Sequence, residues 1–390
     1  MKGPGGPPLA AVLFSLWAAG SGCKSEAPAP CPSAPDAGAG DALALASFAP
    51  RSRLHAKKTA VPAARFPVVD FHQHVNSRVG DEGLAFVADK LLALMDATNV
   101  ATLVILTGPR GKDLERLVDT LVKPHPDRFV VFTMIDWSDI DHRSFGKKAA
   151  AQLRADVARG ARGLKVLKEL GLYLRDEDGR LLAIDDPRFD PIWKACGDLG
   201  IPVAIHSGDP EAFFDPVDAH NERYEELKEH PDWSFADPEF PRLQALLAAR
   251  DRVIARHPRT TFVALHVGGW PENLDYVSRL LSEHPNVFVE LGARQAELGR
   301  QPRRARQLFV EYPDRILFGT DFWPSAEMYA NHFRWLETED EYFPYWDHPA
   351  QGRWNIYGLG LPGEILKKVY NENARRILSQ RRNQRRQRGR

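Results

Sequence analysis

Two histidines separated by one residue end an apolar run in the stretch "VVDFHQHV" (residues 68–75). Side chains of a β-strand alternate between its two faces, so His72 and His74 point to the same side if this run is a strand. Neutral imidazoles are good ligands for a divalent metal and poor fillers of a hydrophobic core. This stretch alone leaves two interpretations open, a metal site or two strand-end histidines satisfied by polar neighbours.

Three further residues that can bind a metal or transfer a proton follow apolar runs later in the chain. His206 ends "IPVAIH", His266 ends "TFVALH" and Asp321 ends "RILFGTD". Imidazoles and one carboxylate suit a borderline metal such as zinc, which lowers the pKa of bound water to about 7. The set therefore predicts a metal centre, with His266 as acid, base or electrophile and Asp321 as ligand and proton acceptor.

The elements that must position these residues are short β-rich runs that alternate with helical patterns from residue 66 onward. Such alternation predicts parallel βαβ units, and eight of them fit a (β/α)8 TIM barrel, in which the C-terminal strand ends meet at one mouth. An open doubly wound sheet is the alternative. The Gly-rich phosphate loop that follows the first strand of such a sheet is not found after the first run of this sequence. The eight runs are "FPVVDFHQH", "VATLVILT", "RFVVFTMID", "ARGLKVLK", "IPVAIHS", "TFVALHV", "NVFVELG" and "RILFGTD".

One connector recurs along the chain, in which a proline stops a helix and a strand begins within a few residues. Histidines in these connectors belong at helix C-termini, away from the strand ends that form the mouth, so we interpret them as structural. The prolines are Pro126, Pro258, Pro285 and Pro313, and the histidines are His125, His257 and His284.

The motif "DFHQH", the two strand-end histidines and "GTDF" together resemble the amidohydrolase superfamily. More narrowly, they are similar to the branch that includes aminocarboxymuconate-semialdehyde decarboxylase. The resemblance covers about residues 66–378, including the closing helix "VYNENARRIL". It implies one divalent metal ion, commonly Zn²⁺, with His266 as the catalytic histidine. The implied metal ligands are His72, His74, His206 and Asp321.

Two basic residues are candidate substrate contacts. Lys165, in "GLKVLKELG", can bind a substrate carboxylate, and in two-metal members of the superfamily a lysine on this strand is often carboxylated. We expect one metal and a substrate-binding Lys165, with Lys168 as the alternative inward residue. Arg294, in "ELGAR", can bind an anionic substrate or form a surface ion pair. Insertions after strands four and five, residues 170–189 and 207–237, are expected to shape the pocket.

The amino end of the chain predicts export. Residues 1–23 read as a signal peptide whose end resembles a bacterial lipobox, with Cys23 as the lipidated residue and ordinary secretory cleavage as the alternative. Residues 24–64 read as a flexible Ala/Pro-rich tether, 65–378 as the catalytic barrel and 379–390 as a basic tail. We therefore expect an envelope lipoprotein, or a periplasmic or secreted protein.

Composition narrows the function further. The chain has 390 residues, and 52 Lys and Arg balance 52 Asp and Glu, which gives no support to a nucleic-acid partner. We predict a metal-dependent hydrolase in which metal-bound water attacks an amide, ester or lactone bond of a small molecule. The alternatives are a non-oxidative decarboxylase at the same site and a non-catalytic exported binding protein. The sequence leaves open the substrate, the metal in the cell, the oligomeric state and the number of metal ions, since His266 could ligate a second one.

Overall fold

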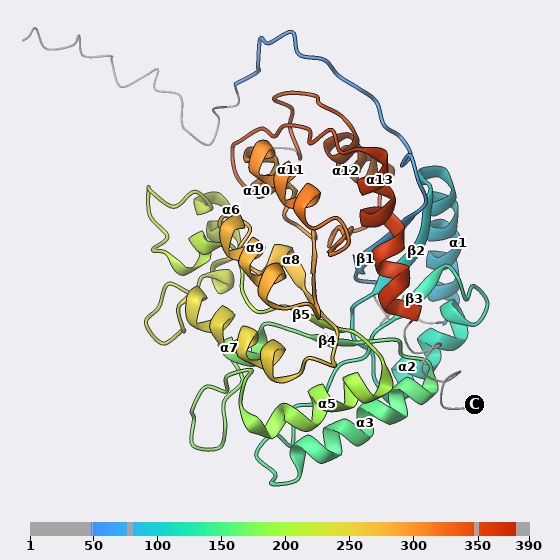
Figure 1. Ribbon diagram of the computed structural model, residues 1–390, viewed down its shortest axis with the longest axis vertical. Coiled ribbons are helices and arrows are strands. Elements are labelled where there is room, and N and C mark those ends of the chain that lie inside the picture. Colours follow the sequence, from blue (N-terminus) through green and yellow to red (C-terminus); the bar gives the residue numbers. More distant parts are fainter. Residues whose placement is uncertain (1–47, 49, 76–80, 347–350, 380–390) are drawn as a thin grey trace, which may run out of the picture. The chain divides into compact units, whose positions relative to one another are not determined.

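The computed structural model describes residues 48, 50–75, 81–346 and 351–379 (Figure 1). The predicted signal peptide with Cys23, most of the predicted tether and the basic tail from residue 380 onward lie outside the described residues. Residues 53–390 cluster as one compact unit. No helix in the described part of the chain is both long and apolar enough to cross a membrane.

All eight predicted strands are present, and every neighbouring pair within a sheet is parallel. They form two sheets, with strand orders β1-β2-β3 and β4-β5-β6-β7-β8. Nearly all strand residues are buried, as expected for strands covered on both faces. The strands are β1 (Val68–Gln73), β2 (Val100–Ile105), β3 (Phe129–Val131), β4 (Leu164–Val166), β5 (Val203–Ile205), β6 (Phe262–Ala264), β7 (Val287–Glu290) and β8 (Ile316–Leu317).

Backbone contacts join the two sheets at both seams. Thr133, just after β3, forms a parallel bridge with Leu164 of β4. At the other seam the Phe71 N–H donates to the carbonyl of Phe318, 3.0 Å away, beside β8. The eight strands therefore follow each other around a ring in chain order, which is the predicted (β/α)8 barrel.

Helices surround the strands (Figure 1). The α-helices are α1 (Asp81–Thr98), α2 (Gly111–Leu117), α3 (Phe145–Arg159), α4 (Glu169–Leu172), α5 (Asp190–Leu199), α6 (Tyr224–Glu229), α7 (Leu243–Arg256), α8 (Leu265–Gly268), α9 (Leu274–Glu283), α10 (Gln295–Arg300), α11 (Pro302–Glu311), α12 (Ala326–Glu337) and α13 (Gly363–Lys367). Single π-helical or 3₁₀ turns are η2 (Val118–Val122), η3 (Pro187–Phe189), η4 (Glu211–Phe214), η5 (Pro231–Trp233) and η6 (Lys368–Glu372).

The proline connectors behave as predicted. His257 and His284 are the C-cap residues of α7 and α9, and a proline follows each of them. His257 also contacts the Asp190 carboxylate at 3.0 Å, which is a structural role. These histidines are thus separated from the strand ends that carry the candidate site.

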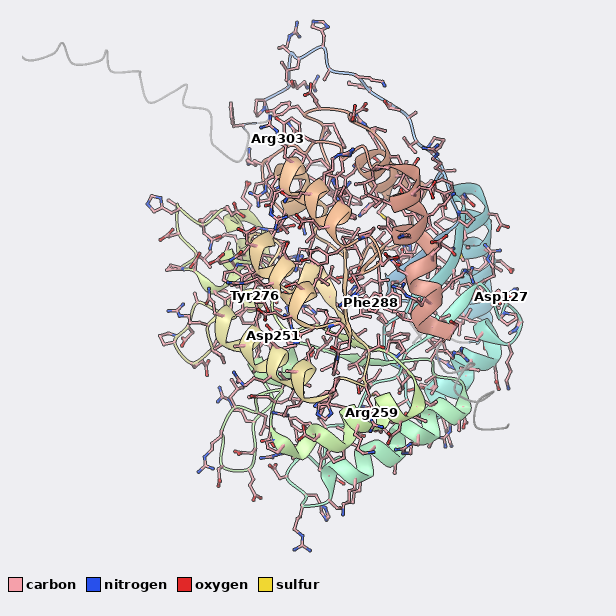
Figure 2. All side chains as sticks on the ribbon, in the orientation of Figure 1. Asp127, Asp251, Arg259, Tyr276, Phe288 and Arg303 are labelled. Carbon is pink, nitrogen blue, oxygen red and sulfur yellow. The ribbon has the colours of Figure 1, made fainter. Side chains whose placement is uncertain are left out.

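The barrel interior is filled by apolar side chains from alternate strand positions, closed by residues of the last helical segment. Phe288 of β7, labelled in Figure 2, belongs to this cluster together with Phe71 and Phe132, whose rings meet edge to face at 5.6 Å. Ala374 and Ile377 complete it. The interior is therefore a packed core, and space for a ligand is confined to the mouth.

Both predicted insertions are present, and the second one has its own small core. Phe213 and Phe214 of η4 are buried there, at 4% and 3% exposure, against residues of α7. These aromatic side chains anchor the insertion on the barrel. Cys196 of α5 is buried and has a free thiol, as predicted for a core residue.

The folded unit begins earlier than predicted. Thr59 donates to the Asp340 carboxylate through both its N–H (2.6 Å) and its hydroxyl (2.7 Å). The Ala64 N–H donates to the carbonyl of Thr98, 3.1 Å away, and Ala64 itself is buried. The last part of the expected tether is therefore docked on the barrel through these hydrogen bonds.

Candidate active site

His72 and His74 converge on one carboxylate oxygen. The Nε2 atoms of His72 and His74 lie 3.3 Å and 3.1 Å from Oδ1 of Asp321. His72 lies near the end of the buried strand β1, whereas the side chain of His74, just after the strand, is 42% exposed. Asp321 follows β8, so strand ends from opposite ends of the barrel sequence meet here, as predicted.

Asp321 is held as an anion by these imidazoles. Burial alone would raise the pKa of its carboxyl, but the surrounding imidazoles of His72, His74 and His266 bring the pKa well below its usual range. Asp321 therefore offers charged oxygens at neutral pH, as a metal ligand must.

His266 presents one unpartnered nitrogen to the site. Its Nδ1 lies 2.8 Å from the carbonyl oxygen of Gly292, so this nitrogen carries the proton and Nε2 has the lone pair. Nε2 is buried, has no hydrogen-bond partner among the described residues and lies 3.9 Å from Oδ2 of Asp321. Burial, with His206 and Arg294 nearby, brings the pKa of His266 well below its usual value. His266 is therefore a neutral imidazole that can accept a proton.

The backbone is strained where the site is built. Three residues of the mouth other than glycine have a positive φ: His266 (56°), Ala293 (54°) and Asp321 (56°). Val267, whose β-branched side chain disfavours this conformation, also has φ 56°. Such conformations persist only where the surrounding fold enforces them, and they cluster at functional sites.

His206 lies beside this cluster but faces another residue. Its ring centre is 4.2 Å from that of His266, and its Nε2 lies 3.3 Å from Oδ1 of Asp209. Burial, its largest cause, lowers the pKa of His206 to about 4. Of the four implied metal ligands, the structure thus brings three donor atoms to one point and turns the fourth residue toward Asp209.

Glu290, at the end of β7, is a site residue that the sequence analysis missed. Its Oε2 lies 3.1 Å from Nδ1 of His72, and its Oε1 accepts the N–H of Gly292. The side chain is fully buried. Glu290 was detectable as a carboxylate within the predicted strand "NVFVELG", near the strand end that faces the mouth.

The structure places the two candidate lysines differently than predicted. Lys165 of β4 is 1% exposed and its Nζ lies 3.4 Å from Nε2 of His72. Burial lowers its pKa to about 8. It therefore lies under the site instead of lining the substrate cavity. Lys168 lines the cavity and forms an ion pair of 2.6 Å with Asp209.

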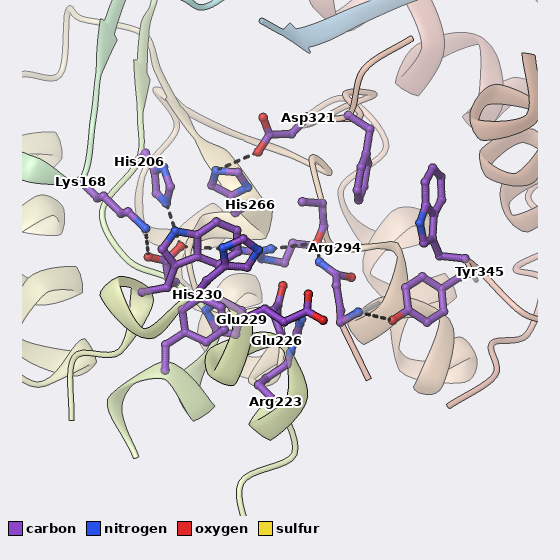
Figure 3. Close-up of a pocket in the computed structure, with 18 residues that line it drawn as sticks. Lys168, His206, Arg223, Glu226, Glu229, His230, His266, Arg294, Asp321 and Tyr345 are labelled. Atoms are coloured by element: carbon purple, nitrogen blue, oxygen red, sulfur yellow. Dashed lines mark hydrogen bonds and ion pairs between the residues drawn. The ribbon is translucent and has the colours of Figure 1, made fainter. Parts of the chain in front are cut away.

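A cavity of about 440 Å³ opens beside His266 and Asp321 (Figure 3). Arg294 lies in its wall and is only 5% exposed, so the surface ion pair that the sequence allowed is wrong. Its Nη2 lies 3.9 Å from Asp209, and its Nε is buried without a hydrogen-bond partner among the described residues. The insertion after β5 and the segment after α12 supply other lining residues that sequence reasoning missed: Arg223, Glu226, Glu229, His230, Tyr345 and Trp346.

The donor set fits a divalent metal ion. The Nδ1 of His72 faces the Glu290 carboxylate, so in the neutral ring Nε2 has a lone pair directed at an Asp321 oxygen only 3.3 Å away. Two lone pairs at this distance repel unless a proton or a cation lies between them, and burial lowers the pKa of His72. Donors at about 2.1 Å from a tetrahedral ion are about 3.4 Å apart, which agrees with the observed separations.

These features define a class, the (β/α)8 barrels with a candidate metal centre of histidine and carboxylate at the C-terminal strand ends. A family model described as amidohydrolase matches residues 69–380. The chain therefore belongs to the amidohydrolase family, whose members use a divalent metal.

Solved structures agree on the fold. A TIM-barrel protein from Bordetella bronchiseptica is 18% identical, with a TM-score of 0.53, over 81% of this chain and 99% of the other. A dihydroxybenzoic acid decarboxylase from a Polaromonas species, solved with manganese and 2-nitroresorcinol, is 17% identical, with a TM-score of 0.50, over 80% and 97%. A search of curated proteins found no match.

Proposed function

We propose that this chain is a metal-dependent hydrolase that cleaves an amide, ester or lactone bond in a small molecule. One observation carries the proposal: the Nε2 atoms of His72 and His74 both lie within 3.3 Å of Oδ1 of Asp321, next to the unpartnered Nε2 of His266. A donor set for a Lewis acid beside a neutral base, at the mouth of a cavity, is the arrangement that hydrolysis of a carbonyl compound requires.

In this proposal His72, His74 and Asp321 hold one divalent ion, with Zn²⁺ as the expected metal and His206 as the fourth ligand. Such an ion would supply Lewis acidity toward water and toward the substrate carbonyl. The Nε2 of His266 accepts a proton from the nucleophile and returns it to the leaving group. Asp321 Oδ2, 3.9 Å from this nitrogen, favours the transient imidazolium.

Decarboxylation is the second candidate, because a buried arginine lines the same cavity. Arg294 lines the cavity, and its guanidinium can bind a carboxylate there. The fold is also similar to that of a dihydroxybenzoic acid decarboxylase. Turnover of lactones, esters and amides compared with release of CO₂ from unsaturated and aromatic acids would separate the two reactions.

Elemental analysis of the purified protein, beside His72→Ala and Asp321→Ala, tests the metal centre. We expect about one equivalent of metal in the wild type and its loss in both variants while the circular dichroism spectrum persists. Absence of metal after reconstitution with Zn²⁺ and Mn²⁺ would refute the proposal. A loaded protein whose ligand binding is unaffected by His266→Ala, and which turns over nothing, would instead support the non-catalytic binding protein.

We also propose that the protein is exported and anchored by lipid at Cys23, on the evidence of the sequence "GSGCK" after an apolar run. Radiolabelled fatty acid should enter the wild type and not Cys23→Ala, and both should leave the cytoplasm. Equal labelling of the two would contradict lipidation at this cysteine.

A further inference from the structure

The candidate metal ligands lie on both sides of a seam in the barrel. His72 and His74 belong to the end of β1, whereas Asp321 follows β8, and these strands are in separate sheets. Two backbone hydrogen bonds cross here: Phe71 N–H to the Phe318 carbonyl and Asp321 N–H to the His72 carbonyl, both 3.0 Å. The separation of the ligands therefore depends on how firmly these two chain segments are joined.

One carboxylate spans this seam. Oδ1 of Asp70 accepts the N–H of His72 on its own strand (3.2 Å) and the N–H of Thr320 on the opposite segment (3.1 Å). Its Oδ2 accepts hydrogen bonds from the side chains of Gln73 (2.6 Å), Thr320 (2.8 Å) and Tyr329 (2.8 Å). Five donors thus meet one buried side chain, and the two backbone donors adjoin candidate ligands from each side.

The strand is irregular at the same place. The register of β1 against β2 shifts between Asp70 and Gln73, as at a β-bulge. Bulges re-aim side chains beside active sites. The side chains of Asp70 and Gln73, three residues apart, are joined by a hydrogen bond, so both lie on the same face of the strand. In a regular strand, residues three apart point to opposite faces. The hydrogen bonds of Asp70 therefore stabilise the irregular strand end that directs His72 into the mouth.

Stability of the core alone does not require this group. Asp70 is 0% exposed, and among the described residues no lysine or arginine forms an ion pair with it. A buried carboxylate without a cation is costly, and an apolar side chain would fill the position more favourably. The hydrogen bonds to Asp70 instead fix the relative positions of the two segments that carry the candidate ligands.

We propose that Asp70 is a positioning residue for the candidate metal centre: it clamps the segment of His72 and His74 to the segment of Asp321. The inference rests on the proposed metal site. Asp70 bonds to backbone and to neighbouring polar side chains, and it acts on the ligands only through the chain that carries them.

The test compares Asp70→Ala and Asp70→Asn with a control, Asp156→Ala. Asp156 of α3 is equally buried, at 1% exposure, and accepts hydrogen bonds from Thr133 (3.0 Å) and Gln152 (2.8 Å), but it bonds to no candidate ligand. For each purified protein, Zn²⁺ affinity is measured by chelator competition, the Co²⁺ absorption spectrum is recorded, and stability is measured by urea unfolding.

We expect Asp70→Ala to weaken Zn²⁺ binding about 10- to 100-fold, as is typical when a group that orients metal ligands is lost, and to change the Co²⁺ spectrum. Asp70→Asn keeps an oxygen that can accept both backbone N–H groups, so it should recover most of the affinity. Asp156→Ala should lose stability and keep wild-type Zn²⁺ affinity.

Wild-type affinity in Asp70→Ala, or an equal loss in Asp156→Ala, would overturn the inference. A wild type that binds no Zn²⁺ would instead refute the metal site on which it rests, so the two failures are distinguishable. If Asp70→Ala does not fold, Asp70→Ser, whose shorter side chain cannot reach both N–H groups, is measured by the same criteria.

Discussion

Glu290→Gln tests how the candidate centre orients its ligands. Both oxygens of Glu290 accept hydrogen bonds in the structure, one from Nδ1 of His72 at 3.1 Å and the other from the N–H of Gly292. Glutamine has the same shape but only one oxygen. Whichever way the amide turns, its NH₂ group faces a donor, so either His72 or Gly292 loses its acceptor.

The size of the expected effect of Glu290→Gln follows from the burial of its side chain. The carboxylate is fully buried, so no water replaces the lost acceptor, and a buried donor left unsatisfied costs about 1–3 kcal/mol. If the loss falls on His72, the ring is no longer held with Nε2 toward Asp321, and loss of such an orienting partner weakens metal binding about 10- to 100-fold. We therefore expect weaker Zn²⁺ binding and only a modest loss of stability.

Zn²⁺ affinity is measured by competition with a fluorescent chelator, and the unfolding free energy by urea titration. Glu297→Gln is the matched control, because Glu297 is equally buried (1% exposed) but pairs with Arg223 and has no contact with a candidate ligand. Unchanged Zn²⁺ affinity together with an unchanged unfolding free energy in Glu290→Gln, or the same loss of affinity in Glu297→Gln, would refute the orienting role of Glu290.

Three further predictions follow from buried groups elsewhere. Arg223→Met should destabilise the fold by about 3–5 kcal/mol in urea unfolding, because it leaves the buried carboxylate of Glu297 without its cation. A loss below about 1 kcal/mol would contradict this. His332, whose pKa burial lowers to about 4, stays neutral in the fold while the unfolded chain takes up a proton. The contribution of neutral His332 to the unfolding free energy is complete above pH 6.5. As the pH falls to 4, the unfolding free energy decreases by about 3 kcal/mol. His332→Gln should flatten the pH dependence of unfolding over that range, and an unchanged slope would count against it. Arg294→Met should raise the KM of an anionic substrate about 10- to 100-fold and leave that of a neutral one unchanged, since a charged hydrogen bond contributes about 1.5–3 kcal/mol; equal effects would argue against anion binding.

The strand pattern could be predicted from the sequence because each strand is a short apolar run bounded by polar or breaking residues. The barrel then brings the strand ends together whatever the details of packing, so the meeting of His72, His74, His266 and Asp321 followed from the order of the runs. The proline connectors could be predicted for the same reason, since proline acts locally.

Other features depend on contacts between distant parts of the chain. The burial of Arg294 comes from the insertion after β5, which covers the mouth and brings Asp209 within 3.9 Å of the guanidinium. The same insertion turns His206 toward Asp209, a competition that no local pattern encodes. The docking of Thr59 likewise depends on Asp340, 281 residues away.

The charges at the mouth favour a neutral reacting group over a carboxylate. Lys168 is already neutralised by Asp209 at 2.6 Å, and Arg294 shares the same carboxylate at 3.9 Å. Lys165 is the basic side chain nearest to the candidate ligands, but its Nζ faces Nε2 of His72, the nitrogen assigned to the metal. A cation bound there would repel a lysine ammonium, whose pKa is already lowered to about 8 by burial. Positive charge for a carboxylate beside the metal is therefore limited to part of Arg294, which is why we place hydrolysis before decarboxylation.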